Sequence, residues 1–119
     1  DLLPALLATA EGQLDHFALQ WSDNHAMTVV MAAEGYPGTP KKGGTIAGLD
    51  AAEADGAKIF HAGTTLGDDG ALTASGGRVL NITAMAPTLR AAADTAYAAI
   101  DRIEWQDGFW RRDIGKAAL

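Results

Sequence analysis

The chain has 119 residues, 48% of them hydrophobic, a length that fits one domain with a modest core and no second full domain. Its net charge of −6, with only nine Lys and Arg, argues against nucleic acid as a partner. The absence of cysteine excludes disulfides and thiolate metal sites. No apolar run reaches the roughly 18 residues that span a bilayer, and no basic segment precedes the first apolar stretch, so we expect a cytoplasmic protein without membrane contact.

The first residues predict a short amphipathic helix. Four leucines among the first seven residues recur at helical spacing, with Asp1 placed to cap the helix and Gly12 placed to end it. Because this pattern begins at Asp1 without an initiating Met, we interpret the sequence as cut from a longer chain.

A hairpin and a loop are predicted next. Apolar residues alternate over 17–21 and again over 27–31, and the residues between them, 22–25, are turn formers. Residues 35–48 are rich in Gly and Pro and too broken for a strand or helix, so they predict an ordered loop.

A second hairpin is expected after that loop. Residues 58–61 have strand character, the Gly-Asp-Asp-Gly stretch at 67–70 is a strong turn signal, and a strand is expected at Leu72-Thr73.

The last part predicts a strand and a long helix. Residues 79–84 are β-rich, and Pro87-Thr88 marks a switch to helical spacing, with Thr88 as the N-cap. The apolar stripe of this helix comprises Leu89, Ala92, Ala93, Ala96, Tyr97, Ile100 and Ile103. Strands joined by turns, with this helix after the last and a short one before the first, predict an α+β fold: a small antiparallel sheet with a long flanking helix.

Cations beside glycines are the first candidate ligand contacts. Lys41 and Lys42 lie in the glycine-rich loop, where an ammonium can meet a phosphate or carboxylate; the alternative is a solvated loop lysine. Arg78 follows Gly76-Gly77, and its guanidinium can hold a phosphate through two parallel hydrogen bonds. The alternative is a structural Arg in a hairpin turn.

His61 is the candidate histidine, because it ends an apolar strand just before Gly63-Thr64, where a side chain can face a cleft. The alternative is a structural histidine. His16 and His25 are interpreted as surface residues. No pair of these histidines has a metal-ligand spacing with a nearby carboxylate, so no metal site is expected.

The remaining charged groups are assigned no chemistry. Asp68 and Asp69 are expected to be solvated turn residues. The Arg-Arg-Asp stretch at 111–113 is expected to form an ion-paired tail packed by Phe109 and Trp110. No nucleotide-binding glycine motif and no nucleophile motif is present, so no catalytic residue is assigned.

Four segments, in fixed order, resemble one family. They are Gly35-Tyr36-Pro37-Gly38 with Lys42-Gly43, then His61-Ala62-Gly63-Thr64, then Gly76-Gly77-Arg78-Val79-Leu80, then Phe109 with Arg111-Arg112-Asp113-Ile114-Gly115. The set resembles the C-terminal part of phosphoribosylamine–glycine ligase, or glycinamide ribonucleotide synthetase, the ATP-grasp enzyme of purine synthesis. The resemblance runs from about Leu2 to Gly115.

This resemblance implies the C-terminal domain of an ATP-grasp ligase at 16–119, preceded at 1–15 by a helix from the end of the ATP-grasp region. It implies a ligase that joins phosphoribosylamine and glycine while ATP is hydrolysed to ADP and phosphate. The N-terminal and ATP-grasp domains of the same chain would be its partners. ATP and Mg²⁺ would be bound mainly outside this fragment, so the fragment alone is expected to be inactive.

The resemblance also implies one wall of a cleft around the phosphoribosyl group. The substrate-binding residues would be Lys42, Gly43, His61, Gly63, Thr64, Gly76, Gly77 and Arg78. The chain departs from the family at Pro40, where a Tyr is usual, and at Lys116–Leu119, which we interpret as a vector-derived tail. The rival hypothesis is a non-catalytic protein-interaction module, which predicts an exposed apolar patch and no affinity for sugar phosphates.

Overall fold

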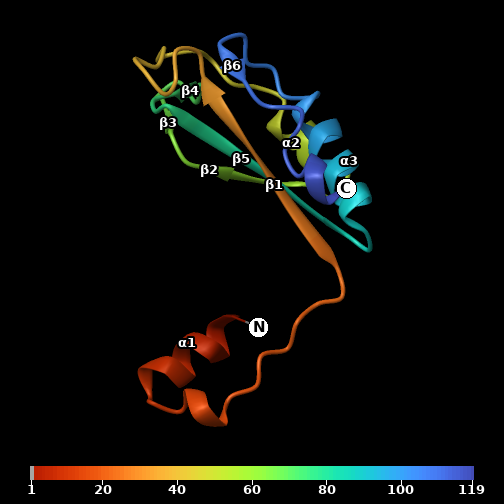
Figure 1. The fold of residues 1–119 in the computed structure, drawn as a ribbon. Coiled ribbons are helices and arrows are strands. Elements are labelled where there is room, and N and C mark those ends of the chain that lie inside the picture. Colours follow the sequence, from red (N-terminus) through yellow and green to blue (C-terminus); the bar gives the residue numbers. More distant parts are fainter. Residues whose placement is uncertain (1) are drawn as a thin grey trace.

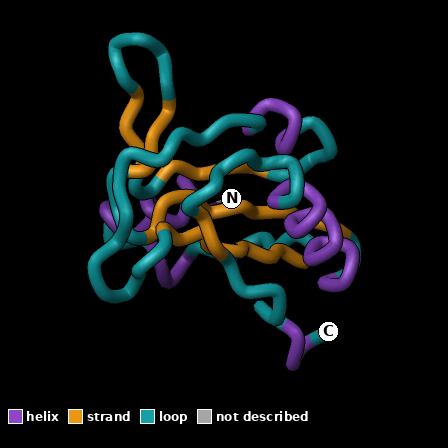
Figure 2. The backbone as a smooth tube through the Cα atoms, turned by 90° about the horizontal axis from the view of Figure 1, so that it is seen from above, coloured by secondary structure: helices purple, strands orange, loops and turns teal. Residues whose placement is uncertain are grey.

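The predicted small antiparallel sheet with a long flanking helix is confirmed in the computed structural model, which describes residues 2–119 (Figure 1). The main sheet has the strand order β2-β5-β1-β6, and every neighbouring pair is antiparallel. Its strands are β1 (His25–Ala33), β2 (Lys58–His61), β5 (Arg78–Ala86) and β6 (Gly108–Phe109). A separate hairpin joins β3 (Thr64–Leu66) to β4 (Leu72–Ala74) and projects from the body (Figure 2).

The pairing of β1 with β5 gives the sheet two different faces. Val29 lies opposite Ile82, and both side chains are fully buried. The next pair along the strands, Thr28 and Thr83, points to the other side, where the two hydroxyls lie 2.8 Å apart. Among residues 2–119 no helix covers this second face, which is called the open face below.

Helix α3 (Leu89–Ile100) covers the buried face and packs on β1 and β5. Its predicted N-cap is confirmed: the Thr88 hydroxyl accepts a hydrogen bond from the Ala91 N–H at 3.1 Å. Ala92, Ala96 and Ile100 are fully buried, as their helical spacing predicts. A second helix, α2 (Leu49–Glu53), was not expected, because five residues within a loop are too few for a periodic pattern.

The hairpin predicted over 17–31 is wrong. Only β1 forms, and residues 17–24 contain no strand. Leu19 and Trp21 are exposed, Trp21 to 83%, so the alternating side chains pack on no sheet. An alternating pattern predicts a strand with two different faces, but it does not specify which strand will pair with it. Among the described residues, no strand pairs with residues 17–24.

The second hairpin forms with a different first strand. Residues 58–61 belong to the main sheet as β2, whereas the partner of β4 is β3, which lies beyond a bend at Ala62-Gly63. At this bend the N–H groups of Ala62 and Gly63 both donate to the carbonyl of Val79, at 3.0 and 3.1 Å. The predicted turn at 67–70 is confirmed by the Gly70 N–H, which donates to the Gly67 carbonyl at 2.9 Å.

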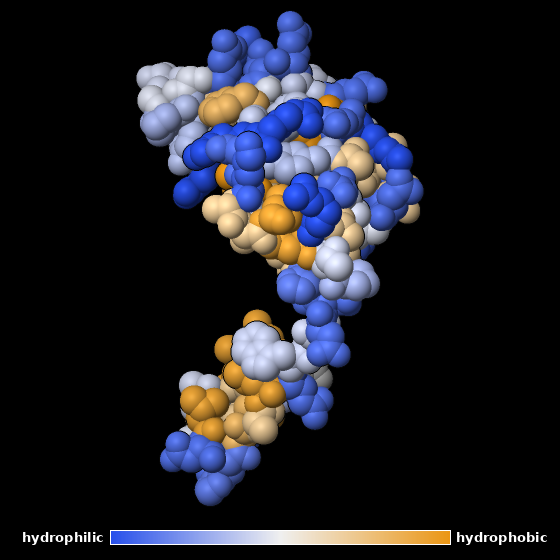
Figure 3. Space-filling view, turned by 45° about the vertical axis from the view of Figure 1, so that its right-hand side comes forward, coloured by the Kyte–Doolittle hydropathy of each residue, from blue (hydrophilic) through white to orange (hydrophobic). Residues whose placement is uncertain are grey.

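The N-terminal part lies apart from this body (Figure 1). The predicted helix is present as α1 (Leu2–Ala10), and Gly12 follows it with a left-handed φ of +66°; the proposed cap at Asp1 lies outside the described residues. Leu2 and Leu3 are 71% and 75% exposed, and the apolar surface of this part is visible in Figure 3. None of the described helices is long and apolar enough to cross a membrane.

Candidate functional site

The backbone segments that carry the predicted site residues meet where β1 ends and β5 begins, here called the loop end of the sheet. The Gly43 N–H donates to the Ala74 carbonyl at 2.8 Å, and the Gly63 carbonyl accepts from the Ser75 N–H at 2.7 Å. The Gly77 carbonyl accepts from the Ala33 N–H at 2.8 Å. The glycine-rich loop, the bend at 62–63 and the turn at 75–77 are therefore adjacent.

Two of the predicted glycines, Gly63 and Gly77, are explained by tight packing of the chain on itself. A Cβ at Gly63 would lie 2.5 Å from the Arg78 carbonyl oxygen and 2.9 Å from the Gly76 Cα. A Cβ at Gly77 would lie 2.6 Å from Cδ2 of the Tyr36 ring. Gly63 needs glycine whether or not a ligand binds, because a side chain would overlap backbone atoms, whereas a side chain at Gly77 would require the Tyr36 ring to shift.

Arg78 is the first residue of β5, and its exposed side chain lies on the open face. It lines an apolar cavity of about 220 Å³ together with residues that include Val30, Tyr36, Phe109 and Arg111. Among residues 2–119 its guanidinium makes no ion pair, although acidic residues outnumber basic ones in the sequence. An exposed guanidinium of this kind is available to an anion.

The structure separates the two candidate lysines. The Lys41 ammonium donates to Oδ1 of Asp107 at 2.5 Å and lies 3.8 Å from a Glu34 carboxylate oxygen. The hydrogen bond to Asp107 raises the pKa of Lys41 above its ordinary value, so this ammonium stays charged. Lys42 is exposed and forms no ion pair within the described part of the chain. Lys41 is thus held by the protein, and Lys42 is the lysine available to a ligand.

His61 ends β2, as predicted, with an exposed side chain. Its Nδ1 lies 3.0 Å from the hydroxyl of Thr64, so these two predicted site residues are hydrogen-bonded to each other. The Thr64 hydroxyl orients the ring and leaves Nε2 without a side-chain partner among residues 2–119.

The C-terminal tail contributes residues that the sequence did not indicate. Strand β6 pairs with Ala32 and Ala33 at the end of β1, which places Asp107 beside the glycine-rich loop. Asp107 and its partner Lys41 are 66 residues apart in sequence, and a two-residue strand has no detectable period. No local pattern could therefore have identified Asp107.

The rest of the tail is ion-paired, as predicted. Arg111 holds Asp113 through two hydrogen bonds of 2.8 and 2.6 Å, and Arg112 pairs with Asp101 at 2.5 Å. The bond from Arg111 lowers the pKa of the Asp113 carboxyl below its ordinary value. The hydroxyl of Tyr97 donates to the Arg111 carbonyl at 2.9 Å and so joins the tail to α3.

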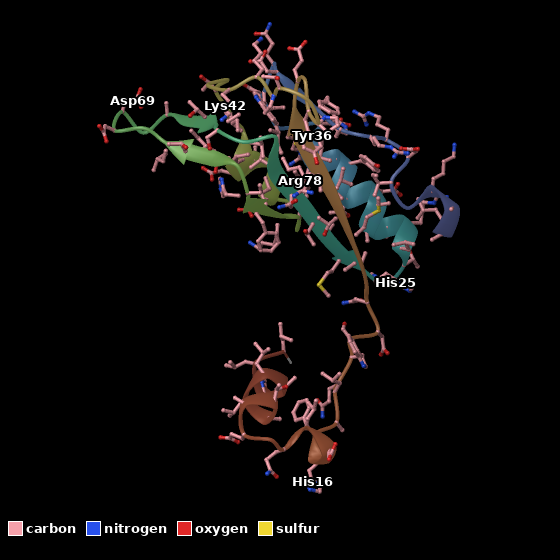
Figure 4. The ribbon with its side chains drawn as sticks, turned by 60° about the vertical axis from the view of Figure 1, so that its left-hand side comes forward. His16, His25, Tyr36, Lys42, Asp69 and Arg78 are labelled. Atoms are coloured by element: carbon pink, nitrogen blue, oxygen red, sulfur yellow. The ribbon has the colours of Figure 1, made fainter. Side chains whose placement is uncertain are left out.

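The remaining candidates lie elsewhere or are local turn groups. Figure 4 shows Tyr36, Lys42 and Arg78 on the same part of the body, whereas His16 lies in the N-terminal part and His25 at the start of β1. Asp69 accepts a hydrogen bond from the Ala71 N–H at 3.0 Å, as expected of a turn residue. Across residues 2–119, no three His, Asp or Glu side chains form a group that could hold a metal ion.

Comparison with known proteins identifies the family of this domain. Residues 26–117 match the family model described as phosphoribosylglycinamide synthetase, C domain. The chain belongs to this family. The match begins one residue after β1 starts, so the N-terminal part with α1 lies before it.

Relatives match the whole chain. The phosphoribosylamine–glycine ligase of Mesorhizobium japonicum is 56% identical over 119 residues, and the chloroplastic one of Arabidopsis thaliana is 49% identical over 121 residues. These matches cover all of this chain but only 28% and 23% of the relatives. A crystal structure of the ligase from Thermotoga maritima superposes on 92% of the chain with a TM-score of 0.71 and 28% identity, covering 27% of that protein. The chain therefore corresponds to the C-terminal part of such a ligase.

Proposed function

We propose that this chain functions as the C-terminal part of a phosphoribosylamine–glycine ligase and that its loop end holds the phosphoribosyl group. In the proposed reaction, ATP phosphorylates the glycine carboxylate, and the amine of phosphoribosylamine displaces phosphate from the acyl phosphate. The products are glycinamide ribonucleotide, ADP and phosphate. The observation that carries the proposal is the pair of exposed cations, Lys42 and Arg78, at a glycine-lined sheet end of an acidic protein.

The proposed roles follow from the chemistry of the side chains. Arg78 can hold two phosphate oxygens at once through its planar guanidinium, whereas Lys42 acts as a point charge. His61, oriented by Thr64, can donate from or accept at Nε2 towards the sugar phosphate. The backbone at Gly43, Gly63, Gly76 and Gly77 completes the wall, and closure against the rest of the enzyme would keep water from the acyl phosphate.

ATP and Mg²⁺ are assigned to the preceding part of the full-length enzyme. Among residues 2–119, no three or more His, Asp or Glu side chains form a group that could hold a metal ion. No step of the reaction is assigned to a metal within this chain. A cytoplasmic location is proposed on the basis of the biosynthetic activity, although the Arabidopsis relative is named as chloroplastic.

The N-terminal and ATP-grasp domains of the full-length chain are the proposed partners of two apolar surfaces. One is the leucine side of α1, which contacts little of the body, and the other is the cavity on the open face. We place residues 1–15 at the end of the ATP-grasp region and 16–119 in the C-terminal domain. An exposed apolar patch also fits the rival interaction module, but that module has no need of Lys42 and Arg78.

The test uses a chimeric ligase, in which this chain replaces the C-terminal 28% of the Mesorhizobium japonicum enzyme. Arg78→Ala should raise the KM for phosphoribosylamine roughly ten- to a hundredfold, the loss of about 1.5 to 3 kcal/mol for a charge-assisted hydrogen bond. The KM for ATP should stay within about twofold. Arg90→Ala, which removes an exposed arginine of α3, is the matched control and should change neither constant.

Two outcomes would reject this assignment of Arg78. A raised KM for ATP with an unchanged KM for phosphoribosylamine would place Arg78 at the nucleotide. A lower melting temperature without a change in either constant would make it a structural residue.

The chain on its own should lack ligase activity, because the proposed ATP and magnesium sites lie outside it. The measurement is ADP release from the 119-residue chain with ATP, magnesium, glycine and phosphoribosylamine, with the chimeric ligase as positive control. Turnover of roughly one per second or more by the isolated chain would contradict the proposal.

A further inference from the structure

Asp107 contacts the glycine-rich loop at two places, and Glu34, the residue just before the loop, at a third. Its carboxylate accepts from the Lys41 ammonium at 2.5 Å, and its carbonyl accepts from the Glu34 N–H at 2.8 Å. A Cβ at Gly44 would lie 2.7 Å from its Oδ2, so the loop backbone lies directly against the carboxylate. Loop residues before and after Lys42 are therefore held by one residue of the tail.

The burial of the two partners shows which one is fixed. The Asp107 side chain is 16% exposed, whereas that of Lys41 is 56% exposed. Asp107 lies between the buried Trp105, whose Nε1 is 3.0 Å from a Cβ placed at Gly44, and strand β6, which is paired with β1. The Asp107 carboxylate is thus fixed by the packed part of the protein, and the glycine-rich loop is held against it.

Backbone hydrogen bonds carry this restraint to both sides of Lys42. The Lys41 N–H donates to the Glu34 carbonyl at 2.8 Å, and the Gly43 N–H donates to the Ala74 carbonyl at 2.8 Å. Lys42 between them is exposed and without an ion pair in the described chain. Its backbone is therefore held in place while its ammonium remains available to a ligand.

We propose that Asp107 is a positioning residue, which fixes the glycine-rich loop so that Lys42 points at the phosphoribosyl group. This inference rests on the proposed function of Lys42 and adds a residue from the tail to the site. Its physical reason is that a cation on a mobile loop must be ordered when the substrate binds, whereas a loop already held by Asp107 avoids that entropic cost. Asp107 touches no substrate in this scheme.

The experiment compares Asp107→Asn and Lys42→Ala, singly and together, in the chimeric ligase. Asp107→Asn should raise the KM for phosphoribosylamine roughly tenfold, as expected when a binding group is misplaced, and leave the KM for ATP within about twofold. Asp107→Glu, which keeps the charge, should recover part of the loss. Asp101→Asn is the matched control: it breaks an ion pair of the same 2.5 Å length, with Arg112, and should leave both constants unchanged.

The double variant separates positioning from general stabilisation. If Asp107 acts through Lys42, Asp107→Asn should add no further increase in KM once Lys42 is Ala. Hydrogen exchange should show faster loss of protection at the amides of Lys41 and Gly43 in Asp107→Asn.

Additive effects of the two substitutions would overturn the role of Asp107 and leave the proposed function standing. Faster exchange without a change in KM would also overturn it. An unchanged KM in Lys42→Ala would instead reject the proposed function of Lys42, so the two failures are distinguishable.

Discussion

At the residue scale, the glycines of the loop end have a structural explanation that sequence reasoning did not provide. The sequence suggests that they admit a ligand, and the structure shows backbone packed against Gly63 and the Tyr36 ring packed against Gly77. Both explanations lead to the same residue type, because the absent Cβ is needed in either case. They differ in what a substitution would do to the free protein.

Gly63→Ala should destabilise the isolated chain by about 1 to 3 kcal/mol, the cost of overpacking, because its Cβ would overlap backbone atoms of Arg78 and Gly76. Gly77→Ala should cost less, since its Cβ meets the Tyr36 ring, and Tyr36 is partly exposed and can move. Urea unfolding of both variants measures the difference. Equal losses would show that the backbone crossing at Gly63 adapts as readily as a side chain.

The ion pair of Arg111 with Asp113 should make stability depend on acid pH. Because the pKa of Asp113 is lowered in the folded protein, the unfolded chain binds a proton more readily, and the pair stabilises the fold above the ordinary carboxyl pKa, near 3.8. That contribution is lost as pH falls through the lower, folded-state pKa. Asp113→Asn should therefore melt slightly below wild type at pH 6, and the two melting temperatures should converge as the pH falls well below 3.8. A difference of the same size at every pH would assign the effect to something other than charge.

At the element scale, α3 is the helix that makes the sheet two-sided. Its alanines and Ile100 cover β1 and β5, and its Tyr97 binds the tail that supplies β6. The loop end is therefore built on strands and a tail that pack against α3. The open face remains available for other contacts.

Ile100→Ala should cost about 2 to 5 kcal/mol, because the side chain is fully buried and its removal leaves a cavity. This is a large part of the stability of a domain this small. Ala98, which is exposed on the same helix, offers the control: Ala98→Ser should change the melting temperature little. An unchanged melting temperature in Ile100→Ala would contradict the packing of α3.

At the scale of the whole molecule, the apolar N-terminal part sets this chain apart from a self-contained domain. The leucines of α1 are more than half exposed, and α1 makes contacts chiefly with the short turn at 14–16. Exposed apolar surface of this kind marks an interaction site. We expect this surface to be buried against the preceding domains in the proposed full-length ligase.

The double substitution Leu3→Glu with Leu7→Glu should therefore lower the melting temperature of the chimeric ligase but not that of the isolated chain. In the isolated chain both side chains are exposed, so the melting temperature should change little. In the chimeric ligase it should fall by several degrees, because two charges would be buried in an apolar contact. Differential scanning calorimetry of both pairs measures this. A fall in the isolated chain alone would show that α1 packs on its own body.

Some features of the protein follow from the sequence because their causes are local. The period of α3 and its Thr88 cap, the turn at 67–70 and the strand content of β1, β2 and β5 are set by neighbouring residues. The family resemblance, which rests on motifs at fixed spacing, correctly indicated the domain.

Only the tertiary structure decided which strands pair and which cations are left without partners. The alternating residues 17–21 pair with no strand among the described residues, and β2 belongs to the main sheet because it pairs with β5, which is not its neighbour in sequence. Lys41 and Lys42 are equivalent in sequence, yet Asp107, brought in by β6 from 66 residues away, binds Lys41 and leaves Lys42 exposed. Contacts between distant segments depend on how the whole chain packs, and no local pattern records them.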